Sequence, residues 1–260
     1  MSAVEIKLLP DIHGAIIFLD RPESYNAIST QLAIELLDAF DQLESNPDVW
    51  AVALTGKGEK AFCTGADLKE RKSMDLKAMK MQRSLFVKMF NRATFFPKPL
   101  IAAVNGFAFG GGFELALCCD YIVASENAVL ALSEVTLGII PAGGGTQNLV
   151  RLVGKNRAKE LIFTARRLTP TECKELNILD TICSFADLEK TYIEKISAIT
   201  KNAPLAVQQA KRAINYGVEI DLNSAFTLEA ECYNVLLTTQ DRNEGLLAFN
   251  EKRPPVYKGM

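Results

Sequence analysis

The chain has 260 residues, of which 48% are hydrophobic and 23% are charged, and its formal net charge is −2. This composition is ordinary for a globular enzyme, and the small net charge gives no general electrostatic attraction for nucleic acid. Because no apolar run reaches the roughly 18 residues that a membrane-spanning helix needs, we expect no membrane insertion.

The first residues, MSAVEIKLLPDIHG, show the pattern of neither a signal peptide nor a transit peptide, so we expect a cytoplasmic protein. They contain the single histidine of the chain, His13, in a sequence typical of a turn. With one histidine there is little room for a histidine-based metal site, and we expect none. The six cysteines form no CxxC pair and are expected to be reduced, buried side chains.

Short apolar runs alternate with helical patterns through the first half of the chain. Strands are predicted at residues 15–20, 51–56, 100–106, 121–125 and 128–132, and helices near residues 30–44, 75–94 and 115–119. This alternation of strands and helices is typical of an α/β fold.

From about residue 204 the pattern changes to helices alone. They are predicted at residues 204–217, 221–239 and 241–255, with Asp241 as a candidate N-cap. A helical tail after an α/β body usually packs on that body or on a neighbouring subunit. We therefore divide the chain into a body at residues 1–203 and a helical region at residues 204–260, and we expect a homo-oligomer.

Glycine-rich turns follow two of the predicted strands. NGFAFGGGFE, residues 105–114, lies where a strand leads into a helix N-terminus, whose N–H groups have no partner within the helix. FCTGADLKE, residues 62–70, follows the strand at 51–56, and a third such turn, GIIPAGGGTQ, covers residues 138–147. None has the spacing of a phosphate loop or a dinucleotide-binding fingerprint. The first two turns could instead converge on one oxygen and form an oxyanion hole.

Each of these features also has a purely structural explanation. Asp67 could cap the next helix, and Glu114 could be a first-turn acid that the helix dipole stabilises. Glu134, in LALSEVTLG, could be an ordinary loop acid. The structural explanation leaves open why an acid stands directly beside three glycines.

Five motifs, in order along the chain, resemble the crotonase (enoyl-CoA hydratase) superfamily: RPESYNAIS, AFCTGADLKE, AAVNGFAFGGGFELALCCDY, SEVTLGIIPAGGGTQNL and AFNEKRPP. ADLKER, VGKNRAKELIF and LLAFNEKRPPVYKG are more similar to the branch of methylglutaconyl-CoA hydratases, some of which also bind AU-rich RNA. The resemblance implies a spiral of ββα units that carries the active site, followed by a helical trimerisation region. It also implies assembly as a trimer or as a hexamer built from two trimers.

The resemblance further implies an active site. Ala66 and Gly111 match the two residues whose backbone N–H groups hold the thioester oxygen, and Glu114 and Glu134 match the two glutamates that hold a water molecule. We assign Glu114 as the base and Glu134 as the proton donor to C2, and a shared role stays open. Thr64 stands where family members often have alanine, which we expect to matter little. This chemistry requires no metal or redox cofactor, and coenzyme A is part of the substrate.

Contacts with coenzyme A are implied in the same way, for Ser24, Ala27, Asp67, Leu68, Lys69 and Lys252. Lys69 would lie near the phosphates, and Lys252 would reach the coenzyme A of a neighbouring subunit. The helix at residues 74–96 could line the acyl pocket through Met79, Met81, Leu85, Phe86 and Met89. It could equally be an ordinary amphipathic helix with a core-facing side.

The expected function is therefore hydration of a 2-enoyl-CoA thioester, in fatty acid metabolism or branched-chain amino acid degradation. Isomerases of the superfamily commonly use a single carboxylate, so the two glutamates favour hydration over isomerisation and other acyl-CoA reactions. RNA binding is a minor alternative, with Lys211 and Arg212 as the obvious basic pair. Methylglutaconyl-CoA is one candidate substrate, and its distal carboxylate would need a cation such as Arg71 or Arg83.

Overall fold

Two β-sheets organise the body of the protein in the computed structural model, which describes residues 2–260. The six-stranded sheet has the order β1 (Val4–Leu9), β2 (Gly14–Leu19), β3 (Ala51–Gly56), β5 (Leu100–Val104), β7 (Tyr121–Ser125), β9 (Thr181–Cys183). The three-stranded sheet has the order β4 (Ala61–Cys63), β6 (Phe107–Phe109), β8 (Val129–Ala131). β1 and β2 are antiparallel, and the other neighbouring strands are parallel.

Successive strand pairs contribute one strand to each sheet. β3 and β4, β5 and β6, and β7 and β8 follow one another along the chain, the first of each pair in the large sheet and the second in the small one. After these pairs come α2 (Leu68–Lys72) with α3 (Leu76–Thr94), α4 (Gly111–Leu117), and η3 (Glu134–Leu137) with α5 (Gly145–Thr164). Parallel neighbours need such crossover connections. The predicted α/β spiral of ββα units is thereby confirmed.

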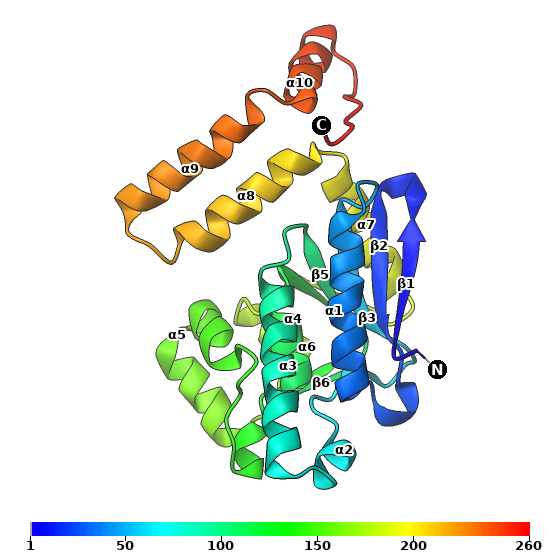
Figure 1. The fold of residues 1–260 in the computed structure, drawn as a ribbon, viewed down its shortest axis with the longest axis vertical. Helices are drawn as coiled ribbons and strands as arrows, with labels where there is room; N and C mark the ends of the chain where they lie inside the picture. The colour runs from blue at the N-terminus through cyan, green and yellow to red at the C-terminus, as the bar shows by residue number, and fades with distance from the viewer. Residues whose placement is uncertain (1) are drawn as a thin grey trace.

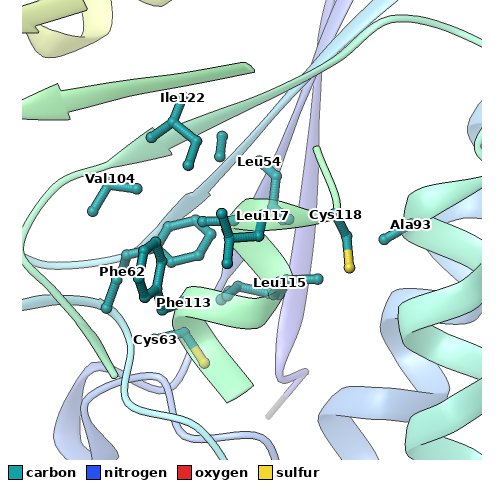
Figure 2. Close-up of a cluster of buried hydrophobic side chains, with 14 of the residues drawn as sticks. Leu54, Phe62, Cys63, Ala93, Val104, Phe113, Leu115, Leu117, Cys118 and Ile122 are labelled. Carbon is teal, nitrogen blue, oxygen red and sulfur yellow. The ribbon is translucent and has the colours of Figure 1, made fainter. Parts of the chain in front are cut away.

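The central strands are largely apolar because both of their faces are covered. β3, AVALTG, and β5, LIAAV, are buried at every residue, as expected for parallel strands that lie between layers. Figure 2 shows one side of this core, where Leu54, Val104 and Ile122 from the large sheet lie near Phe62 and Phe113. On the other side of the sheet, α7 (Leu188–Thr200) packs a second apolar cluster.

The remaining elements of the body are short connections and one long helix. α1 (Thr30–Ser45) is capped by Ser29, whose hydroxyl accepts a hydrogen bond from the Leu32 amide, and α6 (Pro170–Glu175) has a capping box. Short 3-10 helices lie at η1 (Pro10–Ile12) and η2 (Pro22–Ser24). His13 follows the first of them in a left-handed turn conformation, as predicted for a turn residue.

Three helices complete the chain: α8 (Pro204–Gly217), α9 (Leu222–Leu236) and α10 (Gln240–Glu251). In Figure 1, α8 and α9 extend from the body as a pair, and α10 lies beyond them. One attachment of α8 to the body is the ion pair between Lys211 Nζ and Asp120 Oδ2, which are 2.7 Å apart. The predicted helical tail is present. Among residues 2–260, no helix is both long enough and apolar enough to cross a membrane.

The prediction of Asp241 as an N-cap was wrong. Thr239 caps α10, since its hydroxyl accepts a hydrogen bond from the Arg242 amide. Asp241 lies within the first turn, and its buried carboxylate accepts from the amides of Lys258 and Gly259 at 2.7 and 2.8 Å. Its role is to fasten the last residues of the chain to α10.

Candidate active site

The turns after β4 and β6 lie in contact with each other. A Cβ atom on Gly65 would lie 2.9 Å from the Phe109 carbonyl oxygen and 3.0 Å from the Gly111 nitrogen. Contacts this short are too close for a side chain. Glycine at position 65 therefore allows the two predicted turns to meet.

At two of the three consecutive glycines, Gly110 and Gly112, the backbone conformation or a close contact leaves no room for a side chain. Gly110 is the N-cap of α4 with φ 52° and ψ −125°, a combination that is open to glycine and strained for other residues. A Cβ atom on Gly112 would lie 1.9 Å from the Cys63 carbonyl oxygen. Gly111, between them, faces a cavity. The glycines thus bring the start of α4 against β4 while the Gly111 backbone stays accessible.

The backbone N–H groups of Ala66 and Gly111 are both free to bind a ligand. Ile28 donates to the Gly65 carbonyl at 2.7 Å and Asp67 donates to the Ile28 carbonyl at 3.0 Å. In this parallel pairing, Ala66 directs its own N–H away from Ile28. Gly111 occupies the first helical position of α4, where the N–H has no partner within the helix. Among the described residues, neither amide has an acceptor.

Both amides border a cavity of about 730 Å³. Its wall combines the two turns with α3 and the 137–143 segment. The residues that line it include Ala66, Leu68, Arg71, Leu76, Met79, Lys80, Arg83, Phe86, Phe90, Gly111, Glu114, Glu134 and Gly143. Two carboxylates thus share a largely apolar chamber with two free N–H donors.

Glu114 is held firmly by the backbone of the third glycine-rich turn. It is 3% exposed, and its Oε1 accepts hydrogen bonds from the amides of Gly143 at 2.6 Å and Gly145 at 2.8 Å. Burial raises the pKa of Glu114, and these N–H groups and the charge of Arg83 oppose that rise. The surroundings of Glu114 therefore include donors that favour its ionised form.

Glu134, the first residue of η3, has the opposite surroundings. It is 8% exposed, and among the described residues neither of its buried carboxylate oxygens has a hydrogen-bond partner. Burial, and then the charge of Glu114, raises the pKa of Glu134 to about 7. The structure thus brings the two predicted glutamates together and gives them different tendencies to hold a proton.

Arg21, which was not predicted as a site residue, joins the segment of Ala27 to the segment of Asp67. Arg21 Nη2 lies 2.9 Å from Asp67 Oδ2, and Arg21 Nη1 donates to the Ala27 carbonyl at 2.6 Å. Asp67 also caps α2 through the amides of Lys69 and Glu70, as its structural explanation predicted. Arg21 opens the quoted motif RPESYNAIS, which was the available signal for its role.

The residues predicted to contact coenzyme A fall into two groups. Ser24, Ala27, Asp67, Leu68 and Lys69 lie on the two neighbouring segments that Arg21 joins; Leu68 and Lys69 are exposed, and Leu68 lines the cavity. Lys252 is exposed at the end of α10. Figure 1 shows α10 and α2 at opposite ends of the molecule, so Lys252 lies far from the cavity of its own chain. Their contacts with coenzyme A stay predictions.

The helix expected to line the acyl pocket does so with only part of the predicted set. Met79 and Phe86 line the cavity, together with Leu76 and Phe90 of the same helix. Met89 is buried in the core, Leu85 packs against it, and Met81 is 65% exposed. The alternatives were both partly right, because α3 has one face toward the cavity and another toward the core.

Lys211 and Arg212, the basic pair considered for RNA binding, differ in their exposure to solvent. The side chain of Lys211 is 10% exposed and is engaged with Asp120 and with the Lys98 carbonyl, whereas Arg212 is exposed. A buried, paired lysine is poorly placed to neutralise phosphates. The structure therefore gives little support to RNA binding at this helix.

The fold and this chamber, with two free amides beside two buried carboxylates, define a crotonase-type enzyme. The chain belongs to the enoyl-CoA hydratase/isomerase family, whose model matches residues 14–260. It is 40% identical to the short-chain-enoyl-CoA hydratase of Clostridium acetobutylicum over 92% of each chain. It is also 40% identical to the mitochondrial methylglutaconyl-CoA hydratase of Mus musculus, over 94% of this chain and 79% of the relative. The crystal structure of an enoyl-CoA hydratase from Bacillus anthracis matches with a TM-score of 0.96 and 42% identity, over 99% of this chain and 100% of the other.

Proposed function

We propose that the protein adds water across the C2=C3 double bond of 2-enoyl-CoA thioesters. The predicted class, an enoyl-CoA hydratase, is confirmed by the family and by relatives named as hydratases. The observation that carries the proposed chemistry is the pair of buried carboxylates, Glu114 with backbone donors and Glu134 with two unpartnered oxygens. Such a pair can hold one water molecule, and one carboxylate can accept a proton from that water while the other donates a proton to the substrate.

The thioester oxygen would bind between the N–H groups of Ala66 and Gly111. When water attacks C3, electrons move from the double bond to this oxygen and form an enolate. Two pre-positioned N–H donors stabilise that charge without having to reorganise. The start of α4 adds further positive potential at the same place.

The protons then move between the two glutamates and the substrate. Glu114, whose Oε1 has two N–H donors, takes a proton from the attacking water as the C3–O bond forms. Glu134, with a pKa of about 7, carries a proton in a large fraction of molecules near neutral pH and gives it to C2 as the enolate collapses. Water has then been added as H at C2 and OH at C3, and exchange with solvent restores the starting protonation states.

Assembly and coenzyme A binding belong to the same proposal. The helices at residues 204–260 expose large apolar side chains, among them Ile214, Phe226, Tyr233 and Phe249. We infer that they form the contacts of a trimer or hexamer and that Lys252 reaches the coenzyme A of a neighbour. A part in fatty acid or branched-chain amino acid degradation, and a location in the cytoplasm, stay predictions.

Hydration of crotonyl-CoA tests the proposal. Loss of the enoyl absorbance, with a product heavier by one water molecule, is the expected result. Incubation with 3-butenoyl-CoA provides the comparison, because an isomerase would move its double bond without adding water. Isomerisation in the absence of any hydration would overturn the proposal.

A further inference from the structure

Two hydrogen bonds to one residue, Ile28, fix the peptide units on either side of Ala66. The Ile28 amide donates to the Gly65 carbonyl at 2.7 Å, and the Ile28 carbonyl accepts from the Asp67 amide at 3.0 Å. Gly65 has φ 85°, and a glycine offers little steric resistance to rotation of the peptide unit that follows it. The direction of the Ala66 N–H therefore depends on the contact with Ile28.

Arg21 bridges the two segments that this contact joins. Its Nη1 donates to the carbonyl of Ala27, the residue before Ile28, at 2.6 Å. Its Nη2 lies 2.9 Å from Oδ2 of Asp67, the residue after Ala66. The side chains of this ion pair are 20% and 11% exposed, so solvent screens their attraction less than it would on the open surface. The guanidinium thus holds the Ile28 segment against the Ala66 segment.

The backbone of Arg21 is itself anchored in the body of the protein. Asn26 is fully buried; its Oδ1 accepts from the Arg21 amide at 3.0 Å, and its own amide donates to the Arg21 carbonyl at 2.9 Å. The Nδ2 group of Asn26 donates to the carbonyls of Lys57 and Ala61 at 3.0 and 2.7 Å. The guanidinium of Arg21 therefore extends from a fixed base toward the segment of Ala66.

We propose that Arg21 is a positioning residue of the oxyanion hole, which directs the Ala66 N–H at the thioester oxygen without touching the substrate. This inference rests on the proposed hydratase function. Arg21 lies outside the set of described residues that line the cavity. A donor stabilises the enolate only if it already points at the oxygen, and a displacement of about 1 Å can slow a reaction roughly 100-fold. Loss of Arg21 should therefore slow turnover more than it weakens binding.

The first experiment measures hydration of crotonyl-CoA by Arg21→Met, which keeps an unbranched side chain and removes both donors. We expect kcat to fall by roughly 10- to 100-fold and KM to stay within about twofold of the wild-type value. Arg21→Lys keeps the charge and can hold one of the two partners, so it should recover part of the loss.

Arg92→Met is the matched control for the loss of a half-buried, paired arginine. Arg92 Nε lies 2.9 Å from Asp41 Oδ1, its side chain is 21% exposed, and it lies outside the described cavity wall. Both kinetic parameters should therefore stay near the wild-type values.

The second experiment reads the position of the amide without turnover. Butyryl-CoA cannot be hydrated, and a hydrogen bond to its thioester oxygen lowers the stretching frequency of the carbonyl, which an isotope label on the thioester carbon makes visible in infrared difference spectra. The frequency of the bound ester should be lower in the wild type than for the free ester. It should move back toward the free value in Arg21→Met that is saturated with ester, and it should not move in Arg92→Met.

Asp67→Asn breaks the same bridge from its other end, while the asparagine can still cap α2. It should reproduce the changes of Arg21→Met, and it takes the place of that variant if Arg21→Met does not fold. A folded variant with a broken bridge, saturated with ester, whose carbonyl frequency and kcat both equal those of the wild type would overturn the inference.

A direct contact between Arg21 and a phosphate of coenzyme A is the competing explanation. The loss would then appear in KM, disappear with crotonyl-pantetheine, which has no phosphate, and leave the carbonyl frequency of bound butyryl-CoA unchanged; the inference would be wrong. Hydration by the wild type together with any of these contrary results would overturn this inference alone. A wild type that hydrates no enoyl thioester would overturn the proposed function, and the carbonyl frequency would still show whether Arg21 positions the Ala66 amide.

Discussion

Replacing Glu134 with glutamine should slow hydration steeply and yet make the protein more stable at alkaline pH. Burial, followed by the charge of Glu114, raises the pKa of Glu134 from 4.5 to about 7. Ionising this carboxyl therefore costs free energy in the folded protein. Glutamine has a similar size and no charge, and the carboxylate has no hydrogen-bond partner among residues 2–260 that the substitution would orphan.

The magnitude follows from the linkage between protonation and folding. The difference between 4.5 and about 7 corresponds to about 3 kcal/mol, which screening by solvent in the cavity reduces to ~1–2 kcal/mol. Below pH 4.5 the carboxyl is protonated in both the folded and the unfolded chain, so it costs nothing. As the pH rises through about 7, the wild type loses stability and the Glu134→Gln variant does not.

Urea unfolding at about pH 5.5 and about pH 8.5 measures this effect. The protein concentration must be the same throughout, because assembly shifts the midpoint. The free energy of unfolding of Glu134→Gln should exceed that of the wild type by more at the higher pH. Glu23→Gln, at an exposed position, serves as the control and should show no such trend. A difference that is equal at both pH values, or a variant that is less stable at the higher pH, would refute the reasoning.

Three further predictions concern the amide donors, the coenzyme A contact and the pH profile. Gly111→Pro removes an N–H at a first-turn helix position that proline fits, and should lower kcat/KM by roughly a hundredfold or more. Gly111→Ala keeps the N–H and should lose far less; equal turnover of the two folded variants would exclude the donor role. Lys252→Ala should raise KM for CoA thioesters more than it lowers kcat, and this effect should shrink as salt is added. A KM that stays at the wild-type value in the assembled enzyme would contradict the contact between Lys252 and coenzyme A. Hydration should decline as the pH rises through about 7, because Glu134 loses the proton that it donates. In Glu114→Gln, infrared titration should find the Glu134 carboxyl ionising at lower pH, and an unchanged midpoint would contradict the coupling of the two groups.

The strands that could be predicted are those whose sequence alone signals burial. β3 and β5 are almost entirely apolar because layers cover both faces, and the predicted ranges agree with the observed bounds to within two residues. β4, β6 and β9 have three residues each, too few to show a period, and they were missed; β8 is equally short but lies within the apolar run that predicted a strand at residues 128–132. β1, VEIKLL, was missed as an edge strand with partly exposed side chains.

The meeting of the two glutamates could be inferred only from the family resemblance. No local period relates Glu114 to Glu134, since one lies in α4 and the other in η3. In the structure, β8 pairs with β6, and the Gly110 amide donates to the Ala131 carbonyl at 2.8 Å. This pairing brings the segment after β8 to the start of α4. A Cβ atom on Gly110 would lie 3.3 Å from Glu134 Oε1, so a contact between distant strands creates the site.

The most direct test of the central claim compares crotonyl-CoA hydration by the wild type, Glu114→Gln, Glu134→Gln and the double variant, with binding of butyryl-CoA followed in parallel. Each single variant should bind the ester and lose roughly 10²–10⁴-fold in kcat, because glutamine cannot exchange a proton at neutral pH. The double variant should be little worse than the poorer single one, since both groups act on one water molecule. Near-normal hydration by either single variant, with the ester still bound, would contradict the two-glutamate mechanism.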